Sequence, residues 1–130
     1  MRIYLDSCIV IYWLEGEPAL ANAISAKVAG AVGAQLCISD LVRLECRIGP
    51  LRSGDAELLQ AMESLLARLT TLPIDAGVFD LAADLRVQHG LKTPDAIHAA
   101  AAIRHGCSEF WTNDQRLVVL ESRLAVRRIA

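Results

Sequence analysis

Long apolar runs are missing from this 130-residue chain, although 54% of its residues are hydrophobic and its mean hydropathy is +0.37. The longest run, Cys8–Leu14, is far shorter than the roughly 20 residues that a membrane-spanning helix needs. A secretory signal peptide is not predicted, because Asp6 interrupts the first apolar stretch and no small-residue cleavage pattern follows. We therefore expect a cytoplasmic protein with no membrane partner, folded as a single domain over residues 1–130.

Paired cysteines are missing as well. The chain has four cysteines, but they form no C-x-x-C motif and no Cys/His spacing of the kind that binds zinc. Each lies among apolar neighbours, which is typical of small buried thiols. The sequence therefore argues against a zinc site and predicts structural thiols at Cys8, Cys37, Cys46 and Cys107.

An excess of positive charge, the usual mark of a nucleic-acid-binding surface, is also absent, since the formal net charge is −2. Lysine is scarce: of the 13 basic residues only Lys27 and Lys92 are lysines, and the remainder are arginines. The planar guanidinium group suits bidentate contacts with phosphate or carboxylate. Arginine usage that merely follows genomic base composition is an equally good explanation, so residue usage alone does not predict a phosphate-binding role.

Short apolar stretches alternate along the chain with stretches of helical periodicity. Strands are predicted at residues 2–6, 34–39, 71–74, 109–112 and 125–129, with Pro73 indicating that the third is an edge strand or ends there. Helices are predicted after a Ser7 cap and at 18–32, 40–49, 55–70, 75–89 and 93–106, with a break at residues 49–54. This alternation indicates an α/β fold whose central, mostly parallel sheet of about four to five strands is flanked by helices on both faces.

Carboxylates follow the predicted strands at the edge of the sheet where α/β proteins bind their ligands. Asp6 comes directly after the first strand, and Asp114 closes the segment FWTND after the fourth. Glu45 lies nearly two turns into the helix after the second strand, so it looks back over the same edge. Asp95 is expected at the second helical position of TPDAIHAAAA, with Thr93 as the cap.

Each of these carboxylates has an alternative role that needs no ligand. Asp6 can cap the following helix, Asp95 can complement a helix dipole, Glu45 can pair with an arginine of its own helix, and Asp114 can serve in a turn. Acids that gather at one edge, however, repel each other and raise each other's pKa unless a cation neutralises them. Oxygen ligands without a Cys/His set suit Mg²⁺ or Mn²⁺, and ions held in this way hydrolyse phosphodiester bonds. The gathering of the acids therefore favours a metal site.

The four acids stand in these motifs: Asp6 after the first strand, Glu45 within SDLVRLECRIGP, Asp95 within LKTPDAIHAAAA and Asp114 within WTNDQRL. Together the motifs resemble the PIN domain, and specifically the VapC-type toxins of bacterial toxin–antitoxin modules. The resemblance covers nearly the whole chain, with the acids in the family's order and spacing. It implies a single PIN-like domain in which the four acids are the catalytic and Mg²⁺- or Mn²⁺-binding residues of an endoribonuclease. It also implies a VapB-type antitoxin that inhibits the toxin, and a homodimer.

Further residues near the motifs are assigned supporting roles. The resemblance implies supporting polar groups at Thr112 and Asn113. Arginines beside the acidic segments are candidates for guiding RNA phosphates toward the metal, with Arg116 the best placed, followed by Arg43 and Arg47.

His98 stands one turn after Asp95, on the apolar face of the helix predicted at 93–106. An approach of its ring to the acids is one interpretation. Its apolar surroundings favour the other, a buried histidine that is hydrogen-bonded in the core. The alanines around it predict that this helix packs tightly against the sheet.

Other functions fit parts of the same sequence. A PIN-like nuclease that processes RNA without acting as a toxin would use the same four acids, as would a metal-dependent phosphatase or DNA nuclease. A non-enzymatic signalling module of the receiver type would use Asp75, which follows the third strand as a phosphate acceptor does, but WTNDQ offers no lysine. The complete set of acids argues against a PIN-like fold that only binds RNA.

Overall fold

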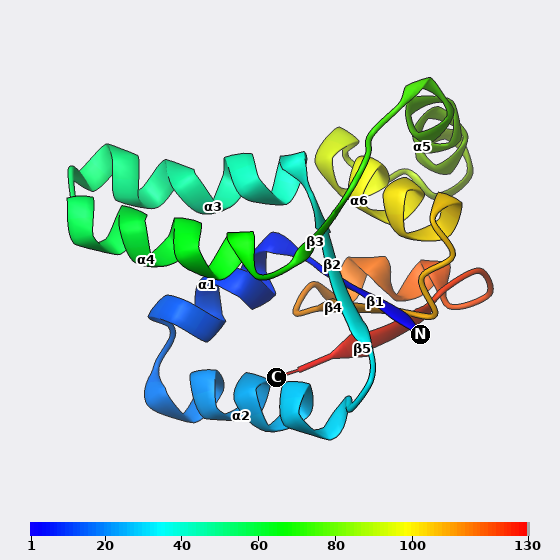
Figure 1. Cartoon of the computed structure of the whole chain (residues 1–130). Coiled ribbons are helices and arrows are strands. Elements are labelled where there is room, and N and C mark those ends of the chain that lie inside the picture. The colour runs from blue at the N-terminus through cyan, green and yellow to red at the C-terminus, as the bar shows by residue number, and fades with distance from the viewer. Residues whose placement is uncertain (130) are drawn as a thin grey trace.

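A computed structural model describes residues 1–129 and confirms the α/β architecture (Figure 1). The strands are β1 (Arg2–Leu5), β2 (Gln35–Ser39), β3 (Thr70–Leu72), β4 (Glu109–Thr112) and β5 (Ala125–Arg128). All of them run parallel in one sheet, in the order β3-β2-β1-β4-β5. Tyr4 of the central strand β1 is in register with Cys37 of β2 and with Phe110 of β4. The apolar sequence of β1 suits this position, because a central parallel strand is covered on both faces.

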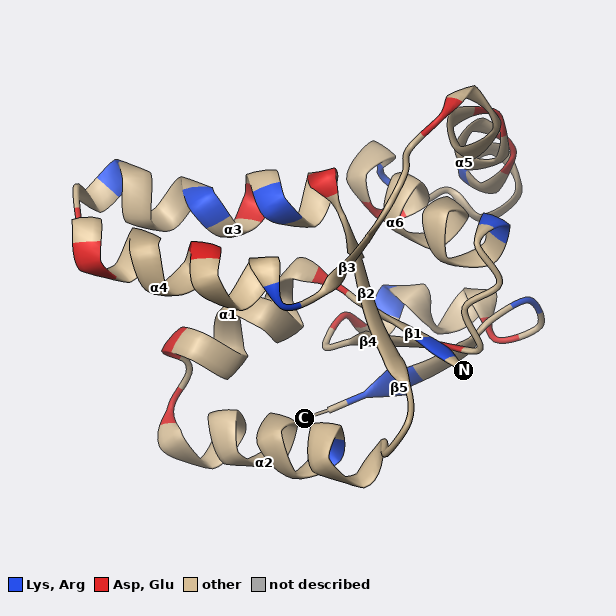
Figure 2. Cartoon of the chain, in the orientation of Figure 1, with Lys and Arg blue, Asp and Glu red and all other residues tan. Residues whose placement is uncertain are grey.

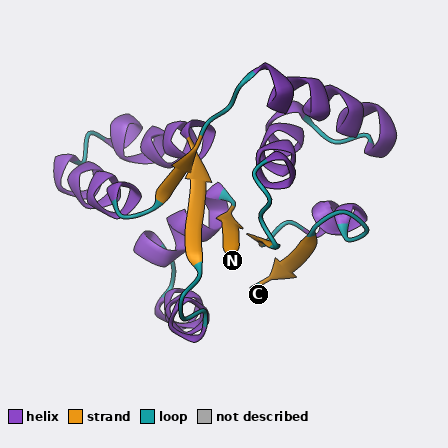
Figure 3. Cartoon of the chain, turned by 45° about the vertical axis from the view of Figure 1, so that its right-hand side comes forward, coloured by secondary structure: helices purple, strands orange, loops and turns teal. Residues whose placement is uncertain are grey.

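Helices fill the connections between the strands. They are α1 (Ser7–Glu15), α2 (Pro18–Gly30), α3 (Asp40–Ser53), α4 (Ala56–Ala67), α5 (Ala76–His89), α6 (Thr93–Arg104) and the 3-10 helix η1 (Gln115–Leu120). The strand order reverses between β1 and β4, so right-handed crossovers place α1–α4 on one face of the sheet and α5, α6 and η1 on the other. Figure 3 shows these two groups of helices on opposite sides of the strands. The point of reversal lies at the ends of β1 and β4, where sheets of this kind bind ligands.

The core is closed by α6, which packs small side chains against the sheet. The rings of Tyr4 and Phe110 stack with their centroids 5.3 Å apart, and both residues are fully buried. The alanines of α6 are fully buried as well, at Ala96, Ala99, Ala100, Ala101 and Ala102. Alanine has the highest helix propensity and the least bulk, so it keeps α6 helical while the helix approaches the sheet closely. The predicted tight packing of this helix is confirmed.

The predicted break at residues 49–54 is wrong except at its end. Helix α3 runs through Gly49 and Pro50 and ends only at Gly54, whose φ of +70° favours glycine. Pro50 provides no backbone N–H, but it is buried on the same face of α3 as Cys46. Burial of this face outweighs the local preference of proline to end the helix.

Two predicted helix caps shift by one residue. Ser7 is the first residue of α1, and Asp6 is the capping residue, whose side chain accepts a hydrogen bond from the Ser7 backbone N–H. Helix α6 begins at Thr93, with Lys92 before it, so Asp95 is the third helical residue and not the second. Both shifts leave the acids in the first turn or directly before it, where exposed backbone N–H groups favour negative charge.

The remaining elements agree with the sequence in position and less well in length. Strand β3 ends at Leu72, directly before Pro73, and lies at an edge of the sheet as the proline predicted. The 3-10 helix η1 was not predicted from the sequence. Within residues 1–129 no helix combines the length and the apolar character that crossing a bilayer requires.

Candidate active site

Asp6 directly follows β1 and is held by contacts from two neighbouring elements. The residue is only 7% exposed. Its Oδ1 accepts a hydrogen bond of 2.8 Å from the backbone N–H of Ser7 and thereby caps α1. Its Oδ2 accepts a hydrogen bond of 2.8 Å from the hydroxyl of Thr112 at the end of β4. The Cys8 thiol also donates to Oδ2, over 3.7 Å. The capping alternative is therefore correct for Asp6, yet Oδ1 still has a lone pair for a further ligand.

Thr112 joins the ends of β1 and β4 at the point where the strand order reverses. Its hydroxyl, which is fully buried, donates to Asp6 and accepts a hydrogen bond of 3.0 Å from the backbone N–H of Asp114. The next residue, Asn113, donates its backbone N–H to the thiol of Cys8 over 3.4 Å. These contacts fix the spacing between the backbone segments that present Asp6 and Asp114.

Asp114 is bound tightly by Arg116. Its Oδ1 accepts the Arg116 backbone N–H over 2.9 Å, which caps η1. The guanidinium group donates to both carboxylate oxygens, with Nε 3.0 Å from Oδ1 and Nη2 2.6 Å from Oδ2. These hydrogen bonds, with the positive charge of Arg116, hold the pKa of Asp114 below its ordinary value. The same Nη2 lies 3.7 Å from Oδ2 of Asp95, so one cation spans two of the acids.

Asp95 is the acid that the others perturb most clearly. It lies in the first turn of α6 with its side chain 20% exposed. Its pKa is raised by burial first and then by the negative charges of Asp114 and Asp6, while Arg116 and His98 act in the opposite direction. A carboxyl group in this position is stabilised in its ionised form by an added cation. Asp6, Asp95 and Asp114 therefore share one electrostatic environment.

Glu45 reaches the same edge from α3 through its contact with His98. Its Oε1 lies 2.6 Å from Nε2 of His98, and this nitrogen is also 3.8 Å from Oδ1 of Asp6. Burial acts to raise the pKa of Glu45, but hydrogen bonds from His98 and Ser7 and the charge of His98 outweigh it, so the pKa is lowered overall. Glu45 is therefore ionised at neutral pH and anchored to a buried ring.

Arg43 and Arg47, which were predicted to bind RNA phosphates, belong to α3, and their side chains contact Glu63 of α4. The Nε of Arg47 donates to Oε1 of Glu63 over 3.0 Å, and Nη2 of Arg43 lies 3.8 Å from the same oxygen. The alternative that Glu45 pairs with an arginine of its own helix is therefore wrong. Figure 2 shows basic and acidic bands alternating along α3. Both arginine side chains are partly exposed, and their contact with RNA stays a prediction.

His98 is buried and hydrogen-bonded, as its apolar surroundings predicted, and it also contacts the site. Its side chain is 2% exposed, and its Nδ1 lies 2.7 Å from the hydroxyl of Tyr4. The Tyr4 hydroxyl also contacts Ser39, and neither residue was predicted to lie beside the site. The available signal was a tyrosine within an apolar central strand, because a buried tyrosine hydroxyl needs a hydrogen-bond partner.

The donor set fits a hard divalent cation. The four acids offer only oxygen ligands, which is the chemistry that Mg²⁺ and Mn²⁺ prefer. Among residues 1–129, no three carboxylate, imidazole or thiol groups converge closely enough to hold a metal ion as they stand. Arg116 donates to both oxygens of Asp114, so in this structure the guanidinium group, a cation, already pairs with this acid.

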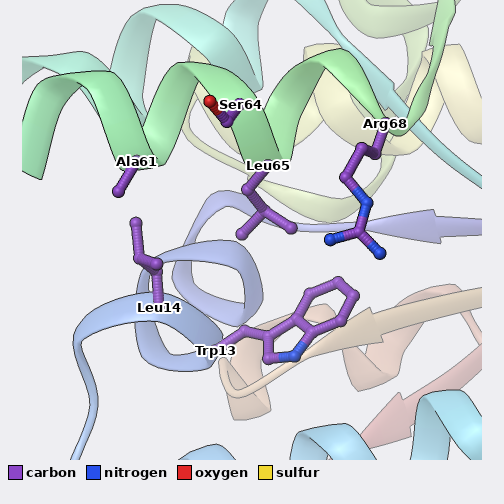
Figure 4. A pocket seen from close by; sticks show the side chains of 6 residues that line it. All are labelled: Trp13, Leu14, Ala61, Ser64, Leu65 and Arg68. Atoms are coloured by element: carbon purple, nitrogen blue, oxygen red, sulfur yellow. The ribbon is translucent and has the colours of Figure 1, made fainter.

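The hollow shown in Figure 4 lies apart from the acids. It has a volume of about 390 Å³ and is formed by α1 and α4, with Trp13 facing Arg68 across it. None of the four acids lines this hollow, so it is not part of the candidate active site. Asp6 and Asp114 lie instead beside the ends of β1 and β4.

The sequence profile of the PIN domain matches residues 3–121 of the chain. The chain belongs to the PIN domain family. This PIN domain is not a signalling receiver: the receiver strand order is 2-1-3-4-5, and Asp75 caps α5 by accepting the Val78 backbone N–H over 3.0 Å. The comparison with curated protein sequences gave no significant match.

Solved structures resemble this PIN domain over almost its whole length. VapBC2 from Rickettsia felis, bound to a DNA fragment from its promoter, has a TM-score of 0.82 and 20% identity over 98% of both chains. A toxin–antitoxin complex from Klebsiella pneumoniae has a TM-score of 0.78 and 21% identity over 96% of this chain and 95% of that chain. VapBC-1 from nontypeable Haemophilus influenzae has a TM-score of 0.78 and 20% identity over 98% of both chains. At these identities the similarity establishes the fold.

Proposed function

We propose that this PIN domain is the toxin of a VapBC-type toxin–antitoxin module and acts in the cytoplasm as a Mg²⁺- or Mn²⁺-dependent endoribonuclease. The observation that carries the proposal is the group of acids around the ends of β1 and β4, where Thr112 connects Asp6 with the Asp114 backbone and Arg116 contacts both Asp95 and Asp114. Glu45 joins this group through His98. The similar solved structures from Rickettsia felis, Klebsiella pneumoniae and Haemophilus influenzae are toxin–antitoxin proteins, which supports the toxin assignment.

The metal ion would be held by the carboxylates of Asp6, Glu45, Asp95 and Asp114. When bound, it supplies an activated water for attack on the phosphodiester bond and stabilises the charge on the leaving oxygen. Thr112 would keep Asp6 in place during this reaction, because its hydroxyl already orients one carboxylate oxygen. Asn113 would support the same turn through its backbone contact with Cys8.

RNA would be bound by arginines around the acids. The side chain of Arg116 is 59% exposed and lies against Asp95 and Asp114, so its guanidinium is within reach of a phosphate that enters the site. Arg43 and Arg47 would extend this contact along α3 to neighbouring phosphates. Because RNA carries one phosphate per nucleotide, a row of arginines along one helix suits a chain substrate.

Protein partners would cover apolar side chains that the isolated chain leaves exposed. Two helices carry them: Leu44 and Leu51 on α3 are 56% and 54% exposed, and Phe79 and Val87 on α5 are 52% and 88% exposed. Exposed apolar surface on helices is typical of protein interfaces. A VapB-type antitoxin and a second copy of the chain are the proposed partners. Light scattering on the purified chain, alone and after mixing with a candidate antitoxin, measures both associations.

The test is cleavage of a structured RNA pool by the purified, antitoxin-free chain with Mg²⁺ or Mn²⁺, compared with EDTA. Asp95→Asn removes a proposed metal ligand, and Asp80→Asn on α5 makes the same chemical change outside the site. We expect metal-dependent cleavage that Asp95→Asn lowers by about 100-fold or more and that Asp80→Asn leaves unchanged.

Three results would argue against the proposal. Absence of cleavage by the folded protein over a wide range of RNAs would contradict the nuclease activity. Cleavage of DNA or of a phosphomonoester in preference to RNA would change the substrate class. Cleavage of RNA without growth inhibition when the chain is expressed would favour an RNA-processing PIN nuclease over a toxin.

A further inference from the structure

A chain of buried hydrogen bonds ends on Glu45. The hydroxyl groups of Ser39 and Tyr4 are 2.8 Å apart, the Tyr4 hydroxyl is 2.7 Å from Nδ1 of His98, and Nε2 of His98 is 2.6 Å from Oε1 of Glu45. Ser39 and Tyr4 are fully buried, and His98 is 2% exposed. The four residues come from β2, β1, α6 and α3, so the chain of contacts crosses the core to the edge where the acids lie.

Hydrogen-bond chemistry gives this chain a direction. An ionised carboxylate only accepts, so Nε2 of His98 carries the proton that points to Glu45. Nδ1 faces the Tyr4 hydroxyl, which can donate to an unprotonated Nδ1 or accept from a protonated one. The Ser39 hydroxyl makes the next contact, with the Tyr4 oxygen. Every buried donor in this series of hydrogen bonds has an acceptor. Among residues 1–129 of the protein, no buried side-chain polar atom lacks a partner.

The Ser39 side chain contacts Tyr4 in place of capping α3. Ser39 occupies the capping position of α3, where a serine side chain ordinarily accepts a backbone N–H of the first turn. It makes no such capping bond and instead contacts Tyr4. The local cap is thus given up for a contact 35 residues away in sequence.

Glu45 needs such support more than the other acids do. Asp6 and Asp114 are placed by their own backbone, since each caps a helix within two residues of the end of a strand. Asp95 has a short side chain in the first turn of α6. Glu45 lies in the interior of α3 and has a longer side chain with more rotamers, so a fixed carboxylate position requires an external contact. His98 supplies that contact from the opposite face of the sheet.

We propose that His98 is a positioning residue that Tyr4 and Ser39 orient and that fixes the carboxylate of Glu45 at the metal site. The inference rests on the proposed function for the identity of the ligand, a divalent cation. It assigns a role to the contact between His98 and Glu45: the ring holds an acid and does not itself bind the metal. Partners of metal-ligating carboxylates commonly change metal affinity about 10–100-fold when they are removed.

Two variants of similar size separate the two contacts of the ring. In His98→Gln the amide nitrogen takes the place of Nε2 and keeps a donor for Glu45. In His98→Asn the shorter amide takes the place of Nδ1, keeps the contact with Tyr4 and removes the histidine donor from Glu45, which keeps its contact with Ser7. Calorimetric titration with Mn²⁺ alone is expected to show about 10–100-fold weaker binding for His98→Asn and a change of less than about threefold for His98→Gln.

His105 provides the matched control. It lies at the opposite end of α6, where its Nε2 contacts the carbonyl oxygen of Pro73 over 2.8 Å. His105→Asn also removes a histidine hydrogen bond, and it is expected to leave Mn²⁺ binding unchanged. Equal Mn²⁺ binding by His98→Asn and the unsubstituted chain would overturn the proposal, as would an equal loss in His98→Gln and His98→Asn.

A measurement without metal keeps the inference separate from the proposed function. Nitrogen-15 NMR of the histidine rings in the free chain is expected to show the His98 proton on Nε2, and this preference is expected to weaken in Tyr4→Phe. A proton on Nδ1 alone would overturn the proposal, whether or not the chain binds Mn²⁺. If the chain binds no Mn²⁺ but His98 carries the proton on Nε2, the proposed metal-dependent function fails and the orienting contact with Glu45 stands.

Discussion

Thr112→Val tests whether one hydroxyl holds the ends of β1 and β4 together. Valine keeps the shape of threonine, so the substitution opens no cavity. It removes the hydrogen bonds of 2.8 Å to Asp6 and 3.0 Å from the Asp114 backbone, and a long contact of 3.9 Å with the Cys8 thiol. A hydrogen bond to a charged group contributes about 1.5–3 kcal/mol and a neutral one about 1 kcal/mol. Because Thr112 is fully buried, water does not replace its hydroxyl. We expect a loss of about 3 kcal/mol in the free energy of unfolding.

Thr112→Ser is the matched control, because it keeps the hydroxyl and removes one methyl group, whose loss costs about 1 kcal/mol. Urea denaturation followed by circular dichroism measures both variants at pH 7. For a chain of 130 residues, a loss of about 3 kcal/mol lowers the thermal midpoint by about 10 °C. A Thr112→Val loss no larger than the Thr112→Ser loss would refute the reasoning, because the methyl group would then matter more than the hydroxyl.

Three further predictions concern charge and thiol chemistry. Asp95→Asn should stabilise the free chain at neutral pH, because the raised pKa of Asp95 disfavours its ionised form in the folded state. Below the ordinary Asp95 pKa of 3.8 the carboxyl group becomes protonated in the folded and unfolded states alike, so the stabilisation should disappear. Thermal midpoints of the variant and the unsubstituted chain that differ equally at pH 7 and pH 3.5 would contradict this prediction. Arg116→Gln should tighten Mn²⁺ binding severalfold in calorimetric titration, since the ion no longer competes with the guanidinium for Asp114; weaker binding would show that Arg116 does not compete. Cys46 and Cys107 should resist iodoacetamide in the folded chain at pH 8, because burial raises the pKa of each thiol to about 12. Mass spectrometry measures the alkylation, and alkylation as fast as in the denatured chain would contradict the prediction.

The sheet was predictable because its strands are short, apolar and bounded by clear helix starts. In an α/β fold, a short apolar segment such as residues 109–112 is buried as a strand of the central sheet. Parallel pairing of the strands follows from the helices that connect them. The end of α3 was not predictable in the same way. Gly49 and Pro50 are residues that locally favour the end of a helix. The burial that keeps α3 helical there depends on packing against other elements, which the local sequence does not show.

The positions of the acids could be predicted from the fold, but the pairing of Asp114 with Arg116 could not. Any residue directly after a parallel strand lies at the ligand-binding edge, so Asp6 and Asp114 could be assigned from their positions alone. The bidentate contact between Arg116 and Asp114 depends on the 3-10 helix that follows, and this helix has no clear periodic signal. The sequence therefore predicted a group of acids, and the structure adds the cation that neutralises two of them.

The hydrogen-bond partners of His98 could not be predicted from helical periodicity. A histidine on an apolar helix face requires hydrogen-bond partners, but periodicity does not identify partners that lie 53 and 94 residues away. Topology does narrow the choice. The chain returns from the edge strand β3 to β4 through α5 and α6, so α6 crosses the sheet beside β1 and brings His98 to the only tyrosine of that strand. Once the strand order is known, Tyr4 and the acids at the end of β1 are the polar groups within reach, and the contact with Glu45 follows from the position of α3.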